Sequence, residues 1–391
     1  MKIPFNKVYL TNSEIAYIKT ALESGHICGD GFYTKSVEFL IEERVQTEKV
    51  FMTTSGTHAL EMAAMMIGLN PGDEVIMPSF TFPSTANAVM LRGAIPVFCE
   101  VEESHLSIDP NDILKKITRK TKAIIAVHYA GISCDMERIM KIAGDHKLFL
   151  IEDAAQGFNS QYRNRYLGSM GHLGCFSFHA TKNYTGGEGG ALLVNDKRLV
   201  KTAETIRNMG TNQSEFLRKE IDKYSWVGIG SKYVPSDILM AFLYAQLQEI
   251  DHITEKRRFI YDYYSYHLKK YVDQGIFQIP LIPADCRSNY HLFYLLFSHP
   301  QMRDQVLDEL NMKEVEGVIH FVPLHSSPMG QKLGYRREDL PFTEQVGNSL
   351  LRLPVYNSIT EEELDYVVKT LADILERKLN AGKLIRCYSS L

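Results

Sequence analysis

Short apolar runs alternate with stretches of helical spacing through the first 250 residues of the chain. The apolar runs predict strands at 74–77, 95–101, 123–127, 148–152, 175–178 and 191–194. The stretches between them predict helices at 57–67, 109–117, 136–146 and 196–207. Several runs are apolar throughout, which is typical of parallel sheets covered on both faces. The alternation predicts a doubly wound α/β domain whose ligands lie beyond the carboxyl ends of the strands.

The pattern changes after Ser236, where helices and strands no longer alternate regularly. Helices are predicted at 236–249, 253–271 and 361–375, and strands at 290–298 and 316–323. We therefore expect two domains. The first, at residues 1–250, is a large α/β domain that includes the N-terminal segment 1–30. The second, at residues 251–391, is a small C-terminal α+β domain.

Composition narrows the class of protein. The 391 residues carry a net charge of −4 and no dense basic block, which argues against nucleic acid as a partner. No apolar run reaches the ~18–20 residues of a membrane span, and the N-terminus has no signal-peptide hydrophobic region, so we expect a cytoplasmic protein without a membrane partner. The six cysteines are scattered and form no CxxC pair, so neither a disulfide framework nor a metal site is predicted.

The segment 148–156, LFLIEDAAQ, is a predicted buried strand that ends in an acidic pair. Asp153 falls at the carboxyl end of this strand, where ligands of a parallel sheet lie. A carboxylate in that place holds a pyridine nitrogen protonated, and this makes pyridoxal phosphate (PLP) an electron sink. For this segment alone, a helix cap or a salt-bridge partner is an equally good interpretation of Asp153.

Residues 175–190, CFSFHATKNYTGGEGG, run from a strand into a loop with a lysine and a glycine cluster. Lysine bonds covalently to an aldehyde, and a pocket can lower the pKa of Lys182 so that the free amine exists near neutrality. Ser177 offers a hydroxyl to a phosphate, and the glycines let the backbone approach a ligand. A lone loop lysine is usually only solvated, but the aromatic strand and GGEGG beside Lys182 favour a cofactor site.

Two further segments carry weaker signals. In TTSGTHA at 53–59, Gly56 and Thr57 open a predicted helix, where backbone N–H groups and the helix dipole bind anions. Plain capping by Ser55 or Thr57 is the more common reason for such a sequence. Phe82 follows a strand and is placed to stack on a flat ring, although an aromatic there is more often core.

Together and in this order, the segments resemble the DegT/StrS family of sugar aminotransferases over nearly the whole chain. The matching segments are CGDGFYTK at 28–35, SGTHALEMA at 55–63, PGDEVIMPSFTFPSTANA at 71–88, VHYAG at 127–131, EDAAQG at 152–157, GCFSFHATKNYTGGEGG at 174–190 and HFVPLH at 320–325. The resemblance implies a fold-type I PLP-dependent transferase, as in aspartate aminotransferase, with a mainly parallel sheet in the large domain. It also implies a homodimer whose active sites are shared between subunits.

The resemblance assigns roles to individual residues. The implied catalytic residues are Lys182, which holds the cofactor, and Asp153, which pairs with the pyridine nitrogen. The implied cofactor-binding residues are Gly56, Thr57, Phe82, Asp153, Gln156, Ser177, Lys182 and Lys232. Tyr184 and His325 are the implied substrate-binding residues.

Lys232 departs from the family pattern. Many members have an asparagine there that reaches the cofactor phosphate of the neighbouring subunit, whereas GSKYVP at 230–235 has a lysine. A lysine serves a dianionic phosphate as a point charge, or it turns to solvent. Both interpretations stay open.

Within the family, the segments NKVYLT, KNYTGGEGG and PLH are most similar to enzymes that form dTDP-4-amino-4,6-dideoxy-D-galactose for enterobacterial common antigen. This implies amino transfer from L-glutamate to dTDP-4-keto-6-deoxy-D-glucose, with 2-oxoglutarate as the second product. Transfer at C3 of the sugar, or to a UDP sugar, stays open. A PLP-dependent dehydratase replaces the lysine by histidine, and a non-catalytic regulator on this fold is expected to lose Lys182 or Asp153; both residues are present.

Overall fold

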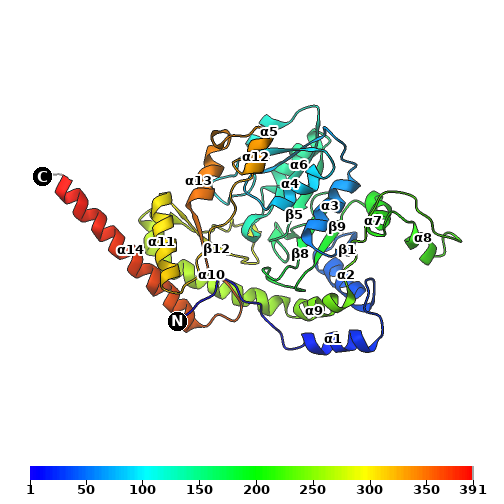
Figure 1. Cartoon of the computed structure of the whole chain (residues 1–391), viewed down its shortest axis with the longest axis horizontal. Helices are drawn as coiled ribbons and strands as arrows, with labels where there is room; N and C mark the ends of the chain where they lie inside the picture. Colours follow the sequence, from blue (N-terminus) through cyan, green and yellow to red (C-terminus); the bar gives the residue numbers. More distant parts are fainter. Residues whose placement is uncertain (390–391) are drawn as a thin grey trace.

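The computed structural model describes the backbone of residues 1–389 and the side chains of residues 1–380. Its centre is a seven-stranded sheet (Figure 1). In spatial order the strands are β1 (Lys49–Thr53), β9 (Gly190–Val194), β8 (Leu173–Ser177), β5 (Phe149–Asp153), β4 (Thr121–Val127), β2 (Glu74–Pro78) and β3 (Ile95–Cys99). β9 runs antiparallel to both of its neighbours, and the other neighbouring pairs are parallel. The predicted α/β fold with a mainly parallel sheet is confirmed.

Helices cover both faces of this sheet. One apolar cluster joins the sheet to α2 (Phe32–Val45), α5 (Pro110–Lys116), α6 (Met136–Asp145) and α9 (Asp237–Gln248). A second cluster joins its other face to α3 (Gly56–Met66), α4 (Pro83–Met90) and α7 (Val200–Arg207). Along β4, Ile124 and Ala126 belong to the first cluster, whereas Ala123, Ile125 and Val127 belong to the second. Successive side chains of a strand point to opposite faces, so a strand covered on both sides is apolar throughout.

A second sheet follows in the C-terminal part of the chain. It is antiparallel, in the order β10 (Phe277–Gln278), β12 (Phe293–Phe297) and β13 (Leu350–Leu353). The helices of this part are α10 (Ile250–Asp273), α11 (Pro300–Met312), α12 (Pro328–Lys332), α13 (Pro341–Ser349) and α14 (Glu361–Ser389). Figure 1 shows α14 leaving the body of the molecule beside α11. The boundary predicted at residue 250 stays a prediction.

The remaining elements connect these parts. They are the helices α1 (Glu14–Glu23) and α8 (Gln213–Leu217), the strands β6 (Gln161–Tyr162), β7 (Arg165–Tyr166) and β11 (Cys286–Arg287), and the short 3₁₀ turns η1 (Tyr129–Gly131), η2 (Lys197–Leu199) and η3 (Arg337–Asp339). β6, β7 and β11 form a small sheet of their own. None of the described helices combines the length and the apolar composition that crossing a membrane requires.

One predicted strand is wrong. Residues 316–323 form no strand and make a single isolated bridge, between Val318 and Arg352. His320 and Phe321 stack on each other with ring centroids 3.7 Å apart, and both line the cavity described below. In a strand these two neighbours would point to opposite faces, so the shared direction of their rings excludes the pleat.

Candidate active site

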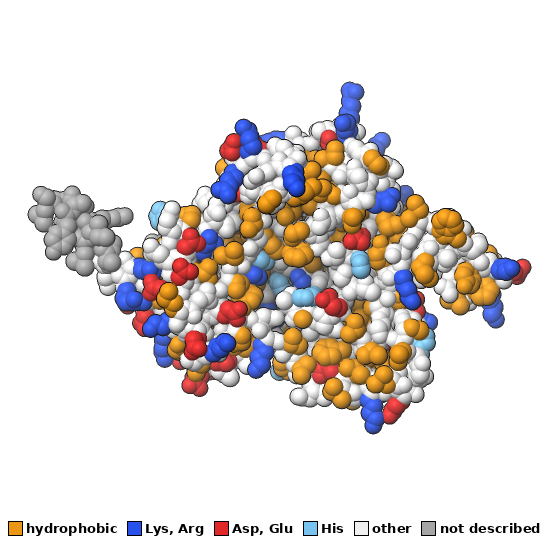
Figure 2. Space-filling model, viewed as in Figure 1, with side chains coloured by type: hydrophobic (Ala, Val, Ile, Leu, Met, Phe, Trp, Pro, Cys, Tyr) orange, Lys and Arg blue, Asp and Glu red, His pale blue; other side chains and the backbone are white. Residues whose placement is uncertain are grey.

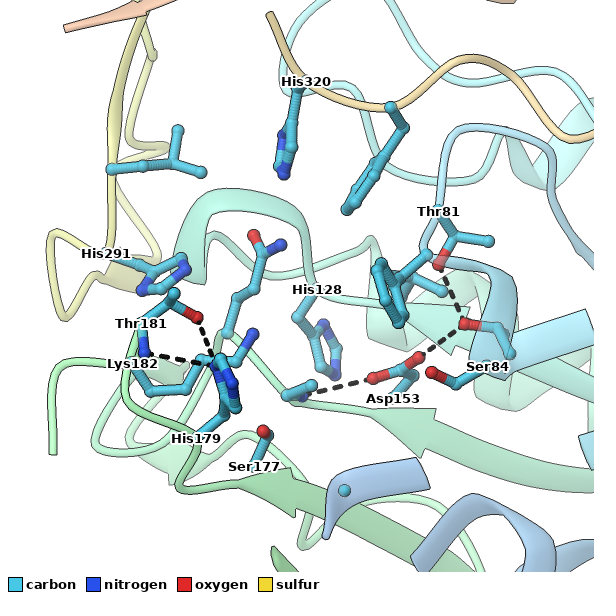
Figure 3. Close-up of a pocket in the computed structure, with 18 of the residues that line it drawn as sticks. Thr81, Ser84, His128, Asp153, Ser177, His179, Thr181, Lys182, His291 and His320 are labelled. Carbon is cyan, nitrogen blue, oxygen red and sulfur yellow. Dashed lines mark hydrogen bonds between the residues drawn. The ribbon is translucent and has the colours of Figure 1, made fainter. Parts of the chain in front are cut away.

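A cavity of about 540 Å³ opens at the carboxyl ends of β4, β5 and β8, between the large sheet and β13 (Figure 3). Seven of the residues predicted from the sequence line it: Gly56, Thr57, Phe82, Asp153, Gln156, Ser177 and Lys182. They come from four segments spread over more than 120 residues, and the parallel sheet brings them together because its strands end at one edge.

Lys182 lies in the loop between β8 and β9. Two backbone hydrogen bonds close this loop, from Phe178 N to the Gly189 carbonyl and from Ala180 N to the Gly187 carbonyl. Burial disfavours the ammonium form and lowers the pKa of Lys182 to about 8, although the charge of Asp153 opposes this shift. A substantial fraction of free amine therefore exists near neutral pH, which is the form that attacks an aldehyde.

Asp153 is 5% exposed and ends β5. Its Oδ2 accepts a hydrogen bond from the Thr85 hydroxyl at 2.8 Å, and its Oδ1 accepts one from Ala155 N at 3.2 Å. Burial raises the pKa of Asp153, whereas these hydrogen bonds and the charge of Lys182 act in the opposite direction. The carboxylate is thus held by fixed donors and faces the cavity without a basic partner within ion-pair distance among the described residues.

The start of α3 combines a capped helix with the features expected of an anion site. Ser55 caps the helix, because its Oγ accepts a hydrogen bond from His58 N at 3.1 Å. Gly56 packs so closely on β8 that a Cβ atom there would lie 2.9 Å from Cβ of Ser177. This approach puts the Ser177 hydroxyl beside the N-terminus of α3, where a phosphate finds backbone donors and the positive end of the helix dipole. Thr57 donates a hydrogen bond from its hydroxyl to Ser84 at 3.0 Å. Gly56, Thr57 and Ser177 together form what we call the phosphate corner.

Phe82 and Gln156 form further parts of the wall. Phe82 is 60% exposed, so it is not the core residue that its type suggested. Oε1 of Gln156 accepts a hydrogen bond from Ala130 N at 2.7 Å, which fixes the orientation of its amide. The cavity therefore holds an amine, a carboxylate, an aromatic ring and a helix N-terminus with a serine beside it. This set of groups fits the aldehyde, the pyridine nitrogen, the ring and the phosphate of PLP.

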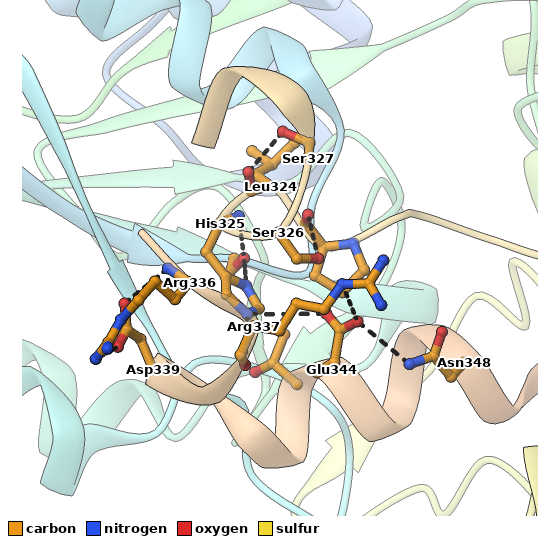
Figure 4. A network of polar contacts seen from close by, with 12 residues as sticks. Leu324, His325, Ser326, Ser327, Arg336, Arg337, Asp339, Glu344 and Asn348 are labelled. Atoms are coloured by element: carbon orange, nitrogen blue, oxygen red, sulfur yellow. Dashed lines mark hydrogen bonds and ion pairs between the residues drawn. The ribbon is translucent and has the colours of Figure 1, made fainter. Parts of the chain in front are cut away.

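His325 is not among the residues that line this cavity and belongs to a separate network of polar contacts (Figure 4). It is fully buried, its Nδ1 lies 2.7 Å from Oγ of Ser79, and its Nε2 lies 3.4 Å from the Arg337 carbonyl oxygen. Glu344 lies 3.9 Å from the same Nε2. Within the chain, His325 ties the segment after 320 to the end of β2. Its expected substrate contact stays a prediction.

Tyr184 also lies outside the cavity, and its expected substrate contact stays a prediction. Its side chain is 1% exposed, and its hydroxyl is engaged by Thr254 at 2.6 Å and by Asn159 at 3.3 Å. It packs against Phe158 in the core rather than lining the cavity. Lys232 lies outside the cavity as well, on an exposed segment that bridges to Asn208. Its expected contact involves a second subunit and stays a prediction.

A buried pair that the sequence analysis missed supports the end of β5. Nε2 of His128 lies 2.9 Å from Oε2 of Glu152, and both side chains are fully enclosed. Glu152 also accepts hydrogen bonds from the backbone N–H groups of Gly168, Met170 and Gly171. Burial raises the pKa of a carboxyl, but His128 and these backbone donors outweigh it and lower the pKa of Glu152. These contacts anchor Glu152 in β5, the strand that ends at Asp153.

The wall opposite Asp153 was missed entirely. It is formed by Arg257, His291, His320 and Arg352. Nδ1 of His291 lies 2.8 Å from Oδ1 of Asn183, and Nδ1 of His320 lies 2.6 Å from the Tyr129 hydroxyl. Burial lowers the pKa of both histidines well below the usual range, so both are neutral at pH 7. His320 lies in the matching segment HFVPLH but was assigned no role, whereas LLRLP carries no signal that distinguishes Arg352 from a surface arginine.

Comparisons with known proteins agree with this geometry. Residues 8–372 match the model of the DegT/DnrJ/EryC1/StrS aminotransferase family. The chain is 30% identical over 377 residues to GDP-perosamine synthase of Escherichia coli O157:H7, covering 96% of this chain and 99% of that protein. It is 31% identical over 385 residues to the spore coat polysaccharide biosynthesis protein SpsC of Bacillus subtilis (strain 168), covering 96% and 97%. Spr1654 from Streptococcus pneumoniae, solved in a PMP form, superposes with a TM-score of 0.90 at 25% identity and covers 98% of this chain and 100% of that protein.

Proposed function

We propose that the chain, which belongs to the DegT/DnrJ/EryC1/StrS aminotransferase family, uses PLP to transfer an amino group from L-glutamate to a nucleotide-linked keto sugar. The observation that carries the proposal is the position of Lys182 and Asp153 in one cavity with the N-terminus of α3. PLP, when bound, supplies an aldehyde for the amine and a protonated ring that delocalises the electrons released at Cα of the donor.

The remaining roles in the reaction belong to residues of the chain. Lys182 holds the cofactor, and once the donor has displaced it, its free amine removes the proton from Cα of glutamate and later delivers a proton to the sugar carbon that receives nitrogen. A pKa of about 8 suits a group that must take up and release a proton near neutral pH. Asp153 keeps the ring nitrogen protonated, while Phe82 and Gln156 orient the ring and Gly56, Thr57 and Ser177 hold the phosphate.

For the acceptor we propose dTDP-4-keto-6-deoxy-D-glucose, which gives dTDP-4-amino-4,6-dideoxy-D-galactose. The support is the similarity of NKVYLT, KNYTGGEGG and PLH to enzymes of that specificity. Transfer at C3, or to a UDP sugar, is the alternative within the family. A GDP-linked acceptor joins these because one relative is GDP-perosamine synthase.

We also propose a homodimer that shares its active sites. Large apolar side chains lie exposed on α1 and α2 and in the segment after 210: Ile15, Leu22, Phe32, Phe39, Leu217, Trp226 and Ile229. Figure 2 shows hydrophobic side chains gathered at the lower right of the molecule, in the region of α1 and α9. Exposed apolar surface of this extent is typical of a subunit interface. A second subunit there brings its Lys232 toward the cofactor phosphate.

Two measurements test the reaction. L-glutamate added to the PLP-loaded protein should abolish the visible absorbance of the bound cofactor. The converted protein, mixed with dTDP-, UDP- and GDP-linked keto-deoxysugars, should regain that absorbance only with its own acceptor, and NMR of the product gives the amino position. Lys182→Ala should bind PLP noncovalently and lose transamination.

Other outcomes would contradict parts of the proposal. Turnover by Lys182→Ala at the wild-type rate would exclude Lys182 as the proton carrier. A protein that binds PLP but shows no spectral change with any amino acid would favour the non-catalytic regulator. One relative, from Geobacillus stearothermophilus, is described as a pleiotropic regulatory protein. The retained Lys182 and Asp153 argue against that alternative for this chain.

A further inference from the structure

The opposite wall of the cavity contains a partly buried arginine, Arg352, with unused donors. Arg352 lies on β13, where its backbone pairs with Tyr294 of β12 and with Val318. An arginine side chain has five N–H donors. Among residues 1–380, its guanidinium donates one hydrogen bond, from Nη2 to the Ile319 carbonyl at 3.0 Å. Its Nε is buried and has no hydrogen-bond partner.

No carboxylate of the described chain neutralises this guanidinium. The acidic residues that line the cavity are Asp153 and Glu188. Asp153 is held by Thr85 across the cavity, and Glu188 lies 3.6 Å from His179. The guanidinium also contacts the ring of Phe5, whose centroid lies 4.7 Å from Cζ of Arg352. A buried donor left unpaired is costly, so such a group in a functional cavity calls for a ligand.

The surroundings of Arg352 select an anion. Arg257 and Lys182 also line the cavity, and the two histidines of the wall are neutral. Arg257 is already satisfied, since its guanidinium donates to the carbonyls of Tyr290 and His291 and to the Asn357 side chain. Arg352 is therefore the cation of this wall that is free to bind, and a planar guanidinium matches the geometry of a carboxylate.

We propose that Arg352 binds a carboxylate of the amino donor and so selects an amino acid as the nitrogen source. The inference rests on the proposed transamination and names a residue that the sequence motifs do not contain. The phosphate corner at Gly56 and Ser177 is built on the other side of the cavity, from α3 and β8. The cofactor phosphate and the donor carboxylate thus have separate cations and donors.

The test compares Arg352→Gln and Arg352→Lys with Arg258→Gln, which removes an arginine that is 56% exposed on α10. The first measurement is the binding of glutarate, a dicarboxylate without an amino group, to the PLP-loaded protein by calorimetry. The second is the glutamate concentration dependence of the loss of cofactor absorbance without any sugar. We expect Arg352→Gln to raise two quantities by about 30-fold or more: the Kd for glutarate, and the glutamate concentration that gives half of the absorbance loss. This is the usual loss when one partner of a buried, charged hydrogen bond is removed. Arg352→Lys should recover part of the affinity, and Arg258→Gln should match the wild type.

The melting temperature distinguishes a ligand-binding role of Arg352 from a purely structural one. Because Nε of Arg352 is buried without a partner and its guanidinium has no carboxylate within ion-pair distance among the described residues, Arg352→Gln should melt no lower than the wild type in the absence of ligands. Its affinity for PLP and its KM for the sugar nucleotide should stay within about twofold. Glutarate and glutamate affinities unchanged in Arg352→Gln would overturn the inference, and so would a lower melting temperature with all affinities reduced together. A wild-type protein that fails to respond to glutamate at all would instead overturn the proposed function, while glutarate binding would still report on Arg352.

Discussion

Thr85 donates its hydroxyl hydrogen to Oδ2 of Asp153 at 2.8 Å, which joins the first turn of α4 to the end of β5. Thr85 is itself fully buried and lies 2.9 Å from the Thr81 hydroxyl. The hydrogen bond favours the ionised carboxylate, whereas burial of Asp153 favours the neutral acid. Thr85 therefore helps to keep Asp153 charged at the pH of the reaction.

Thr85→Val should lower kcat by about tenfold, which corresponds to the loss of one hydrogen bond to a charged group. Without its donor, the pKa of Asp153 rises further, so the carboxylate becomes protonated at a higher pH as the solution is acidified. The acid limb of the kcat profile should accordingly move to higher pH. Thr85→Ser keeps the hydroxyl and should behave as the wild type, and an unmoved acid limb in Thr85→Val would show that Thr85 does not control this charge.

Covalent attachment of PLP should report the pKa of Lys182 directly. Only the free amine attacks the aldehyde, so the attachment rate to cofactor-free protein should rise about tenfold per pH unit below pH 8 and level off above it. Stopped-flow absorbance measures this rate. The charge of Asp153 raises the pKa of Lys182, so Asp153→Asn should move the midpoint to lower pH. A midpoint near 10 in the wild type would show that the amine is not desolvated.

The same burial of Lys182 costs stability before the cofactor binds. Its pKa is lowered from 10.5 to about 8, so between these values the native protein binds fewer protons than the unfolded chain, and stability rises with pH. Below pH 8 the full cost, about 3 kcal/mol, is present. Lys182→Met should therefore raise the free energy of unfolding of the cofactor-free protein at pH 7, by a gain that shrinks toward pH 10.5. Urea titrations at pH 7 and pH 10 measure it, and an equal gain at both would contradict the charge explanation.

The sequence predicts the large sheet well because its strands are buried on both faces. The central strands β2, β4 and β5 each coincide with an unbroken apolar run, at 75–78, 123–127 and 148–151, and each was predicted to within two residues at either end. β1 has only three successive apolar residues, 50–52, between Lys49 and Thr53, and it was not predicted. The region 316–323 is as apolar as a strand, yet its residues turn two successive rings toward the cavity.

The candidate site, too, was predictable only where its residues lie in local sequence motifs. Lys182, Asp153 and Gly56 lie in motifs directly after strand ends, so their position could be read from local sequence. Arg352 lies on β13 of the second sheet and His291 lies just before β12, so the packing of the two sheets rather than a local motif brings them to the cavity. Tyr184 and His325 lie within matching motifs, yet both side chains are buried and neither lines the cavity, so a motif alone does not fix where a side chain points.

Tyr184→Phe distinguishes a core role of Tyr184 from the expected substrate contact. The hydroxyl has Thr254 and Asn159 as partners, so its loss should lower the free energy of unfolding by about 1 kcal/mol. The KM for the sugar nucleotide should not change, because the side chain does not line the cavity. Urea unfolding and steady-state kinetics measure the two quantities. A tenfold rise in that KM with no loss of stability would support Tyr184 as a substrate contact.

Lys232 offers a test of the shared active site. Lys232→Glu should weaken PLP binding by about tenfold, and more at low salt, since it reverses a charge near the phosphate. Lys223→Glu, on the same exposed segment, should leave the affinity unchanged. If Lys232 serves the neighbouring subunit, a mixed dimer of Lys182→Ala and Lys232→Glu chains contains one site with both lysines intact. That dimer should show about half of the wild-type activity at limiting PLP. If Lys232 acts within its own chain instead, the mixed dimer has no intact site and should be nearly inactive under the same conditions.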